Sequence, residues 1–474
     1  MLKRTVKIAL KVIGGLLLLI ILVVSLVLYF TARYDSIDQT FGNHYSQALL
    51  KNAHVIDLEN DTIYSNQYLS IEHGLITEIS SFPPPDIDTT EAIDMEGQYL
   101  IHGLADMHTH VFDPADLMLN LSYGVTHVRN MMGFSYHLDW RQQVEDHKIS
   151  GSYMTTASHT FNGPGDAPPL HIKVDGEEEV KAAIDEAIAD GYDFIKVYDN
   201  LRKETFLALA EYTRSKGIGF AGHPSYYIKN ESLFTAGFQS IEHVEELFQA
   251  MLNYEFDSLA AQELVRELKE REIPVTITMS AYNHLYRTMT EGESFLNTIP
   301  MEQITPAIQF LGKKSLEEWK APQQSSYDWT MKKYAFMEYL VELLDQEDVP
   351  LLLGTDTGPN LTVHGWSVHR EIELLQGMGM SNKKILKSAT VNAAPILNKG
   401  NFSGSIRAGA YANFLVVDQN PLTNPETMEM PMEIYLGSTH YSRGDLLNMR
   451  QYAIDNFYPW YFSAGQLINS VLFK

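Results

Sequence analysis

Residues 103–110 read Gly-Leu-Ala-Asp-Met-His-Thr-His, an apolar run that ends in two histidines one residue apart. In a β-strand, side chains at positions i and i+2 leave the same face, so His108 and His110 can reach one metal ion if this segment is extended. A pair of ligands on a helix would instead be spaced i and i+4. Because the same pattern also occurs as an ordinary polar pair, its interpretation as a metal site depends on the rest of the chain.

Apolar segments of strand length recur along the chain, separated by longer stretches in which apolar residues follow a helical spacing. The helical pattern is clearest over residues 177–190, 203–216 and 259–271. Alternating strands and helices are typical of a parallel (β/α)8 barrel, which places its chemistry at the carboxyl ends of the strands. We expect the eight barrel strands to centre on residues 100–106, 125–130, 153–157, 194–198, 219–222, 239–242, 275–279 and 350–354.

Ionisable residues recur at the ends of these expected strands. Since the carboxyl ends of barrel strands meet on one face, we expect the side chains to converge. They are His108 and His110 after the first strand, Lys196 in the fourth, His223 after the fifth, His243 after the sixth and Asp356 after the eighth.

The segments before and after the expected barrel contain short apolar runs bounded by turn residues. Residues 46–98 alternate such runs with turns, and residues 399–448 contain an apolar strand at 412–417. We expect the two segments to pair in one small β-sandwich domain built from both ends of the chain, with residues 99–398 forming the barrel between them.

The amino terminus combines a basic segment, residues 1–11, with an uncharged apolar segment, residues 12–32. A helix that spans a bilayer needs about 20 apolar residues, whereas the core of a cleavable signal has roughly 7 to 15, so an uncleaved transmembrane anchor is favoured over cleavage near Ala32. The positive-inside rule then places residues 1–11 in the cytoplasm. The rest of the chain is expected on the extracytoplasmic side, periplasmic or extracellular.

The composition excludes several classes of function. The chain has 474 residues, of which 45% are hydrophobic, so it can bury a large core. Its formal net charge of −25 argues against nucleic acid as a partner. It contains no cysteine, which excludes disulfides, thiolate ligands and a cysteine nucleophile. The composition does not determine the oligomeric state.

Short motifs at the expected strand ends resemble those of a known superfamily. With the ionisable residues in the same order, the chain resembles the amidohydrolase superfamily, and more narrowly its imidazolonepropionase-like group, which includes metal-dependent, prolidase-like dipeptidases. The resemblance covers residues 46 to 445, with a departure at His102, where relatives usually have proline. The motifs are Gly-Val-Thr-His-Val-Arg at 124–129, Asp-Phe-Ile-Lys-Val-Tyr at 193–198, Ile-Glu-His at 241–243, Gly-Thr-Asp at 354–356 and Ser-Ala-Thr-Val-Asn-Ala-Ala at 388–394.

The resemblance implies a site for two divalent metals, with zinc as the default and manganese or cobalt as alternatives. Lys196, carboxylated by CO2, would bridge both ions. Its apolar neighbours in the strand favour the neutral amine, the form that reacts with CO2. If its ammonium instead pairs with a carboxylate, the site would be mononuclear. The other implied ligands are His108 and His110 on the more buried metal, His223 and His243 on the second, and Asp356 on the buried metal and the hydroxide between the ions.

Such a site implies hydrolysis, because two divalent ions lower the pKa of a water between them and polarise a carbonyl. Asp356 is suited to take the proton and hand it to the departing nitrogen, although its role could be ligation alone. We therefore expect a membrane-anchored hydrolase that cleaves a carbon–nitrogen bond in a small amide, with dipeptides as leading substrates. The alternatives are a mononuclear, cyclic-amide hydrolase of the imidazolonepropionase kind and a catalytically silent, membrane-anchored binding protein.

Several residues near the expected strand ends are candidates for substrate contacts. They could equally pack as ordinary loop residues. The long segment 280–339 is expected to form a lid or a pocket wall. Residues 449–474 are rich in aromatic side chains, for which we favour docking on the barrel over contact with the membrane interface. The candidates for substrate contacts are His159, Tyr198, Tyr226 and Tyr227, and His369 is a candidate to brace the metal site.

Overall fold

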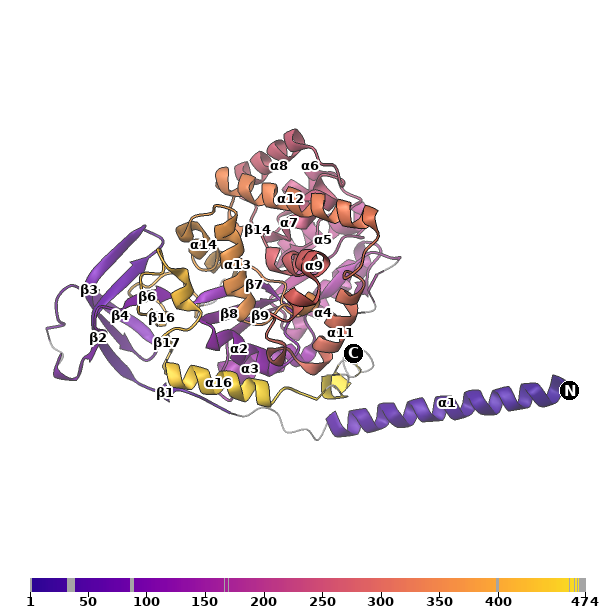
Figure 1. Ribbon diagram of the computed structural model, residues 1–474, viewed down its shortest axis with the longest axis horizontal. Coiled ribbons are helices and arrows are strands. Elements are labelled where there is room, and N and C mark those ends of the chain that lie inside the picture. The colour runs from indigo at the N-terminus through magenta and orange to yellow at the C-terminus, as the bar shows by residue number, and fades with distance from the viewer. Residues whose placement is uncertain are drawn as a thin grey trace.

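Within the residues that the structure describes, eight parallel strands form a nearly closed barrel (Figure 1). A short additional strand, β10 (Ile172–Lys173), pairs with β9. The computed structural model describes residues 2–31, 39–85, 89–165, 167–168, 170–397, 400–459, 461–463, 465–466 and 468. The barrel strands pair in the order β7 (Leu104–Thr109), β8 (Val125–Asn130), β9 (Tyr153–Asn162), β11 (Phe194–Val197), β12 (Gly219–Gly222), β13 (Ser240–Glu242), β14 (Val275–Thr276) and β15 (Leu351–Leu352).

The barrel closes between its first strand and the segment that follows its last. The amide of Met107 donates to the carbonyl of Leu353 at 2.8 Å, and the amide of His110 donates to the carbonyl of Thr357 at 2.9 Å. Thr109 and Thr357 form a parallel bridge. These bonds place the end of β7 beside the loop after β15, although the two regions lie about half the chain apart in sequence.

Helices surround the barrel strands, and the predicted barrel is confirmed (Figure 1). Two of the three predicted helices have the predicted bounds, and the third begins and ends one residue earlier. Helix α4 ends before Gly191, which has φ 93°, and α5 ends before Gly217, which has φ 70°; both glycines supply the left-handed conformation that stops a helix. The helices are α2 (Pro114–Ser122), α3 (Ser135–Glu145), α4 (Glu177–Asp190), α5 (Lys203–Lys216), α6 (Asn230–Ala236), α7 (Val244–Glu246), α8 (Ser258–Glu270), α13 (Trp366–Gly377), α14 (Asn382–Ser388) and α15 (Ala394–Leu397).

The strand expected over residues 100–106 is divided between two sheets. Residues up to His102 belong to the second sheet, and β7 begins at Leu104. At Gly103, between them, an added Cβ would lie 2.3 Å from Oγ1 of Thr126 and 2.4 Å from Oδ1 of Asn413. The backbone therefore passes this junction only because residue 103 has no side chain.

The second sheet contains nine strands in the described part of the chain and combines segments from both ends, as predicted. Its side chains alternate between two cores. Phe414 and Val416 pack within the second sheet, whereas Leu415 and Val417 join the core of the barrel. The domain limits predicted from the sequence stay predictions. The strands run in the order β1 (Asn43–His44), β18 (Thr439–Ser442), β17 (Glu433–Leu436), β16 (Asn413–Val417), β6 (Tyr99–His102), β2 (Gln47–Asp57), β3 (Thr62–Glu72) and β4 (Leu75–Ser80), with β5 (Ile93–Asp94) beside β2.

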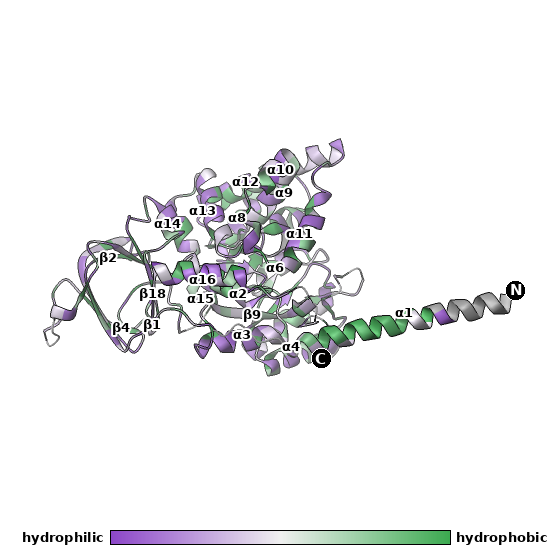
Figure 2. Ribbon diagram, turned by 60° about the horizontal axis from the view of Figure 1, so that its bottom comes forward, coloured by the Kyte–Doolittle hydropathy of each residue, from purple (hydrophilic) through white to green (hydrophobic). Residues whose placement is uncertain are grey.

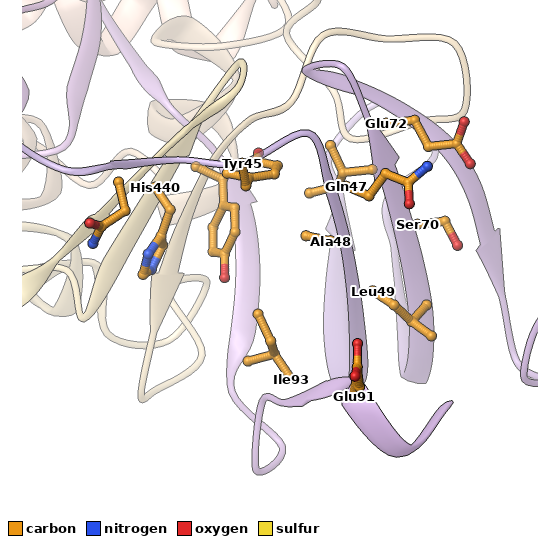
Figure 3. A pocket seen from close by; sticks show the side chains of 12 residues that line it. Tyr45, Gln47, Ala48, Leu49, Ser70, Glu72, Glu91, Ile93 and His440 are labelled. Carbon is orange, nitrogen blue, oxygen red and sulfur yellow. The ribbon is translucent and has the colours of Figure 1, made fainter. Parts of the chain in front are cut away.

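A cavity of about 300 Å³ opens in this second sheet (Figure 3). Tyr45, Glu72, Glu91 and His440 line it, together with residues of β2. Because its lining comes from the second sheet, it is separate from the carboxyl ends of the barrel strands, where barrel enzymes place their chemistry.

The long segment between β14 and β15 folds into helices. The first three share a small core that includes Phe295, Ile308 and Leu316, whereas the last contributes its buried side chains to the core of the barrel. The small core also contains Leu361, which follows Asp356 by a few residues, so the helices form a wall beside the end of β15. The helices are α9 (Met279–Glu291), α10 (Glu293–Leu296), α11 (Pro306–Glu317) and α12 (Gln324–Gln346).

Helix α1 (Leu2–Thr31) projects away from the rest of the chain (Figures 1 and 2). Its segment Ile13–Thr31 has a mean hydropathy of 2.9 and is not buried, so it is long and apolar enough to cross a membrane, although an amino-terminal signal sequence has the same properties. The strongly hydrophobic half of α1 is the half nearer the folded domain (Figure 2).

The carboxyl-terminal tail follows α16 (Arg443–Asp455) and docks on the barrel. Tyr458 and Phe462 are 1% and 6% exposed and belong to the barrel core. The amide of Tyr458 donates to Oδ2 of Asp113 at 2.6 Å. The tail also reaches α1, because the rings of Phe30 and Tyr461 have centroids 6.3 Å apart.

Candidate metal centre

His108, in β7, and His110, directly after it, both face Asp356. The Nε2 atom of His110 lies 3.0 Å from Oδ1 of Asp356, and Nε2 of His108 lies 3.5 Å from the same oxygen. On its other side, Nδ1 of His108 lies 2.7 Å from Oε2 of Glu242. A carboxylate that accepts from Nδ1 holds the proton there and leaves Nε2 free as a ligand.

His243 completes a group that could hold one metal ion. A potential ligand atom from each of His108, His243 and Asp356 lies within 4.8 Å of the others. Thr278 Oγ1 lies 2.7 Å from Nδ1 of His243, so Nε2 of His243 is also free to bind a metal ion. His243 and Asp356 have φ of 68° and 51°, a conformation that side chains other than glycine adopt rarely and that often marks functional positions.

Lys196 and His223 lie on the other side of His243. The rings of His223 and His243 have centroids 4.9 Å apart. Lys196 is 3% exposed, and burial lowers its pKa to about 8, although the nearby carboxylates of Glu242 and Asp356 favour its charged form. All six predicted ligands are thus gathered at the carboxyl end of the barrel.

The protonation states suit metal ligation. Burial lowers the pKa of His108 and His243 well below the usual range and that of His223 to about 3, so these imidazoles are neutral at pH 7. Burial raises the pKa of Asp356, but the hydrogen bond from His110 and the neighbouring histidines together hold it well below its usual range. Neutral imidazoles with an ionised carboxylate form a donor set that fits zinc, manganese or cobalt.

Further buried carboxylates support the ligands. Glu242 accepts from Nη1 of Arg129 at 3.2 Å as well as contacting His108. Oδ1 of Asp106 accepts from the amides of His108 and Thr355 at 3.2 Å and 3.1 Å, which ties β7 to the loop that carries Asp356. Burial raises the pKa of Asp106 to about 7. The roles of Glu242, Arg129 and Asp106 could not be predicted from the sequence, although Glu242 stands directly before His243.

Glu246, in the helical turn after His243, is another such residue. Its Oε1 atom lies 3.1 Å from Nδ1 of His223. Burial raises the pKa of Glu246 to about 8. This contact differs from the hydrogen bond between His108 and Glu242, because Nδ1 of His223 has no hydrogen-bond partner among the described residues.

Of the residues predicted to contact substrate, one packs on a predicted ligand, one packs on an aromatic ring and two are exposed. The ring of Tyr198 stacks on His223 with centroids 4.1 Å apart, so Tyr198 borders the metal ligands. His159 packs against Phe134, with centroids 5.0 Å apart. Tyr226 and Tyr227 are 40% and 61% exposed, at the rim.

The wall helices contribute to the rim as well. Lys333 of α12 forms an ion pair with Glu245, and its Nζ lies 5.7 Å from the centre of the Tyr282 ring. Tyr282 itself packs against His243, with centroids 6.0 Å apart. The expectation for His369 is wrong, because its Nε2 atom lies 2.8 Å from the carbonyl oxygen of Tyr123 and not against a ligand.

The chain is thus a (β/α)8 barrel protein with a group of side chains, His108, His243 and Asp356, that could hold a metal ion. Residues 331–438 match the model of the amidohydrolase family. Over 66 residues the chain is 44% identical to a dihydroorotase from Carboxydothermus hydrogenoformans, a match that covers 14% of this chain and 15% of that protein.

Solved structures share the fold over most of the chain. Bottromycin amidohydrolase superposes with a TM-score of 0.72 at 21% identity, covering 87% of this chain and 91% of that one. A putative prolidase from Bifidobacterium longum gives a TM-score of 0.65 at 20% identity, covering 87% and 100%. A Xaa-Pro dipeptidase with bound methionine gives 0.64 at 20% identity, covering 84% and 100%. The family match over residues 331–438, together with this fold, supports an amidohydrolase superfamily protein and a hydrolase that acts on carbon–nitrogen bonds.

Proposed function

We propose that the chain is a metal-dependent hydrolase with a two-metal site that cleaves the carbon–nitrogen bond of a small peptide. The observation that carries the proposal is the gathering of His108, His243 and Asp356 within 4.8 Å, next to the buried Lys196. By the resemblance to the superfamily, His108, His110 and Asp356 would hold one ion and His223 and His243 a second, while His108, His243 and Asp356 lie close enough that they could also hold a single ion. Lys196, as a carbamate, would supply oxygen ligands to both ions.

Residues of the chain would have distinct roles in the proposed hydrolysis. Two divalent cations supply the Lewis acidity that activates water and polarises the scissile carbonyl. Glu242 keeps the proton of His108 on Nδ1, and Thr278 orients His243. Asp356, ionised and within 3.5 Å of both His108 and His110, would accept the proton of the attacking water and deliver it to the leaving nitrogen.

The state of Lys196 separates this proposal from its main alternative. A neutral amine reacts with CO2 to form a carbamate and releases one proton, and burial favours the neutral amine by lowering the pKa to about 8. Glu242 and Asp356 act in the opposite direction by favouring the ammonium. If the ammonium prevails, the site is mononuclear, and hydrolysis of a cyclic amide of the imidazolonepropionase kind becomes the better proposal.

Two observations support a peptide as the substrate. Solved structures with this fold include a putative prolidase and a Xaa-Pro dipeptidase. The rim also offers the half-buried carboxylate of Asp199, which lies next to Tyr198 and close enough to influence the pKa of His223. A dipeptide carries a cationic amino group that a carboxylate in this position can bind.

A dipeptide library tests the proposal. The full chain, loaded in turn with zinc, manganese and cobalt, is incubated with Xaa-Pro and other dipeptides, and released amino acids are measured, with Asp356→Asn as the inactive control. Release that disappears in Asp356→Asn supports the proposal. Turnover of a cyclic amide without turnover of any dipeptide would replace it with the mononuclear alternative. Absence of any metal from the purified chain after supplementation would favour a catalytically silent binding protein.

We also propose that α1 is an uncleaved, single-pass anchor and that the catalytic domain lies outside the cytoplasm. The hydropathy of Ile13–Thr31 and the basic residues before it support this orientation. Protease added to spheroplasts, from which any outer envelope has been removed, should digest the domain while a cytoplasmic control protein survives. Protection of the domain until the spheroplasts are lysed would contradict the orientation.

A further inference from the structure

We propose that α11 lies on the surface of the bilayer that α1 spans, with Phe310 and Leu311 among the lipid headgroups and Lys313 and Lys314 beside anionic headgroups. This inference rests on the proposed anchor and is independent of the reaction that the site catalyses. It concerns the outer surface of the helices between β14 and β15.

The apolar side chains of α11 are exposed because its other face is occupied. Ile308 and Leu316 are buried in the core of the wall helices. Phe310 and Leu311 are 70% and 58% exposed. Gly312, next to them, packs so closely that an added Cβ would lie 2.5 Å from the side chain of Leu361. This contact fixes the rotation of the helix, so Phe310 and Leu311 cannot turn inward.

The anchor helix shows which face of the domain is next to the membrane. The ring of Phe30, one residue before the end of α1, contacts Tyr461 of the tail, with centroids 6.3 Å apart. Tyr458 and Phe462 hold that tail in the barrel core. In both whole-chain views, α11 lies at the end of the domain from which α1 projects, opposite the second sheet (Figures 1 and 2). A bilayer crossed by α1 therefore faces α11.

The positive charges of Lys313 and Lys314, beside the exposed Phe310 and Leu311, favour a lipid surface as the binding partner of α11. The chain has a net charge of −25, so its surface as a whole is repelled by anionic lipids. Lys313 and Lys314 are exposed, and neither forms an ion pair with any residue that the structure describes. Exposed apolar side chains next to lysines are typical of helices that lie in the membrane interface.

The absence of cysteine from the chain makes a direct test simple. Leu311→Cys is labelled with an environment-sensitive fluorophore, and Leu259→Cys, on α8, is the matched control because Leu259 is 71% exposed and equally apolar. Each full-length variant is inserted by its anchor into nanodiscs of phosphatidylcholine, with or without phosphatidylglycerol. Quenching by a lipid with a spin label near its headgroup is then measured.

The proposal predicts several-fold stronger quenching at position 311 than at position 259. It also predicts that phosphatidylglycerol increases the quenching at 311 and that the double substitution Lys313→Glu, Lys314→Glu removes this increase. Equal quenching at the two positions would overturn the proposal. So would a label at 311 that is already shielded in detergent by a second copy of the chain, seen as a doubled mass, because α11 would then be a protein interface.

Discussion

The Nδ1 atom of His108 lies 2.7 Å from Oε2 of Glu242, so a predicted metal ligand and a buried carboxylate from a distant strand form one unit. Glu242 also receives a hydrogen bond from the buried Arg129. The position of His108 therefore depends on a charge network that extends across the barrel interior. β7 thus carries the predicted ligand, and the last residue of β13 carries the carboxylate that orients it.

Replacing Glu242 by Gln should weaken metal binding about 10- to 100-fold, because His108 loses the carboxylate that holds its proton on Nδ1. It should also lower the free energy of unfolding by about 3 to 5 kcal/mol, because the charge of Arg129 stays buried without a partner. Competition with a chelator and denaturant unfolding measure the two effects. Glu433→Gln is the control, since it breaks a His–Glu contact of 3.0 Å in the second sheet. Equal metal affinity in both variants would contradict the role of Glu242.

The carbamate on Lys196 should form more readily as the pH rises through about 8, the lowered pKa of its ammonium. Above that pH the neutral amine predominates in the folded chain, whereas an exposed lysine with its ordinary pKa of about 10.4 stays protonated. Carbon-13 NMR of the metal-free chain in labelled bicarbonate detects the carbamate, and Lys196→Gln is the control. A spectrum at pH 9 without a signal that depends on Lys196 would remove the bridging group from the account.

The lowered pKa of Lys196 also predicts the direction in which the free energy of unfolding changes with pH. Between about 8 and the ordinary lysine value, the unfolded chain binds more protons than the folded chain, so the metal-free protein should become more stable relative to Lys196→Met as the pH rises through this window. Below pH 8 both forms of the chain carry the charge, and the full burial penalty remains. Denaturant unfolding at several pH values measures the difference. If the difference in free energy of unfolding between the unsubstituted chain and Lys196→Met does not change with pH, Lys196 has an ordinary pKa.

Phe462→Ala should lower the free energy of unfolding by about 3 to 5 kcal/mol, because the ring is almost completely buried in the barrel core. Phe310→Ala removes the same ring from an exposed position and should change stability by less than about 0.5 kcal/mol. Thermal unfolding of both variants in detergent tests whether the tail is docked. Equal melting temperatures would mean that the tail contributes nothing to the fold.

Gly103→Ala should destabilise the chain by about 1 to 3 kcal/mol, because the new Cβ would meet Thr126 and Asn413 at the junction of the two sheets. The control is Gly377→Ala in α13, where an added Cβ meets no atom within 4 Å. That substitution should be neutral or slightly stabilising. Similar destabilisation by both would indicate that the junction is not as crowded as the structure requires.

The sequence predicted the barrel because each strand is a short apolar run and each long helix has a regular apolar spacing, as in residues 177–190. The division at Gly103 was missed because the apolar run continues through both strands and only the three-dimensional crowding separates them. The ligand candidates could be predicted because they follow strand ends. Glu242 could not, since its partner His108 is 134 residues away and a carboxylate within a strand has no local signature.

The central claim is a two-metal site bridged by a carboxylated lysine, and metal content tests it most directly. Elemental analysis of the full chain, purified without chelators, gives the metal per chain, and intact mass in bicarbonate buffer shows whether Lys196 carries CO2. The account predicts two metals per chain with the added carboxyl group, and loss of both in Lys196→Gln. One metal per chain, no added mass and no effect of Lys196→Gln would contradict it.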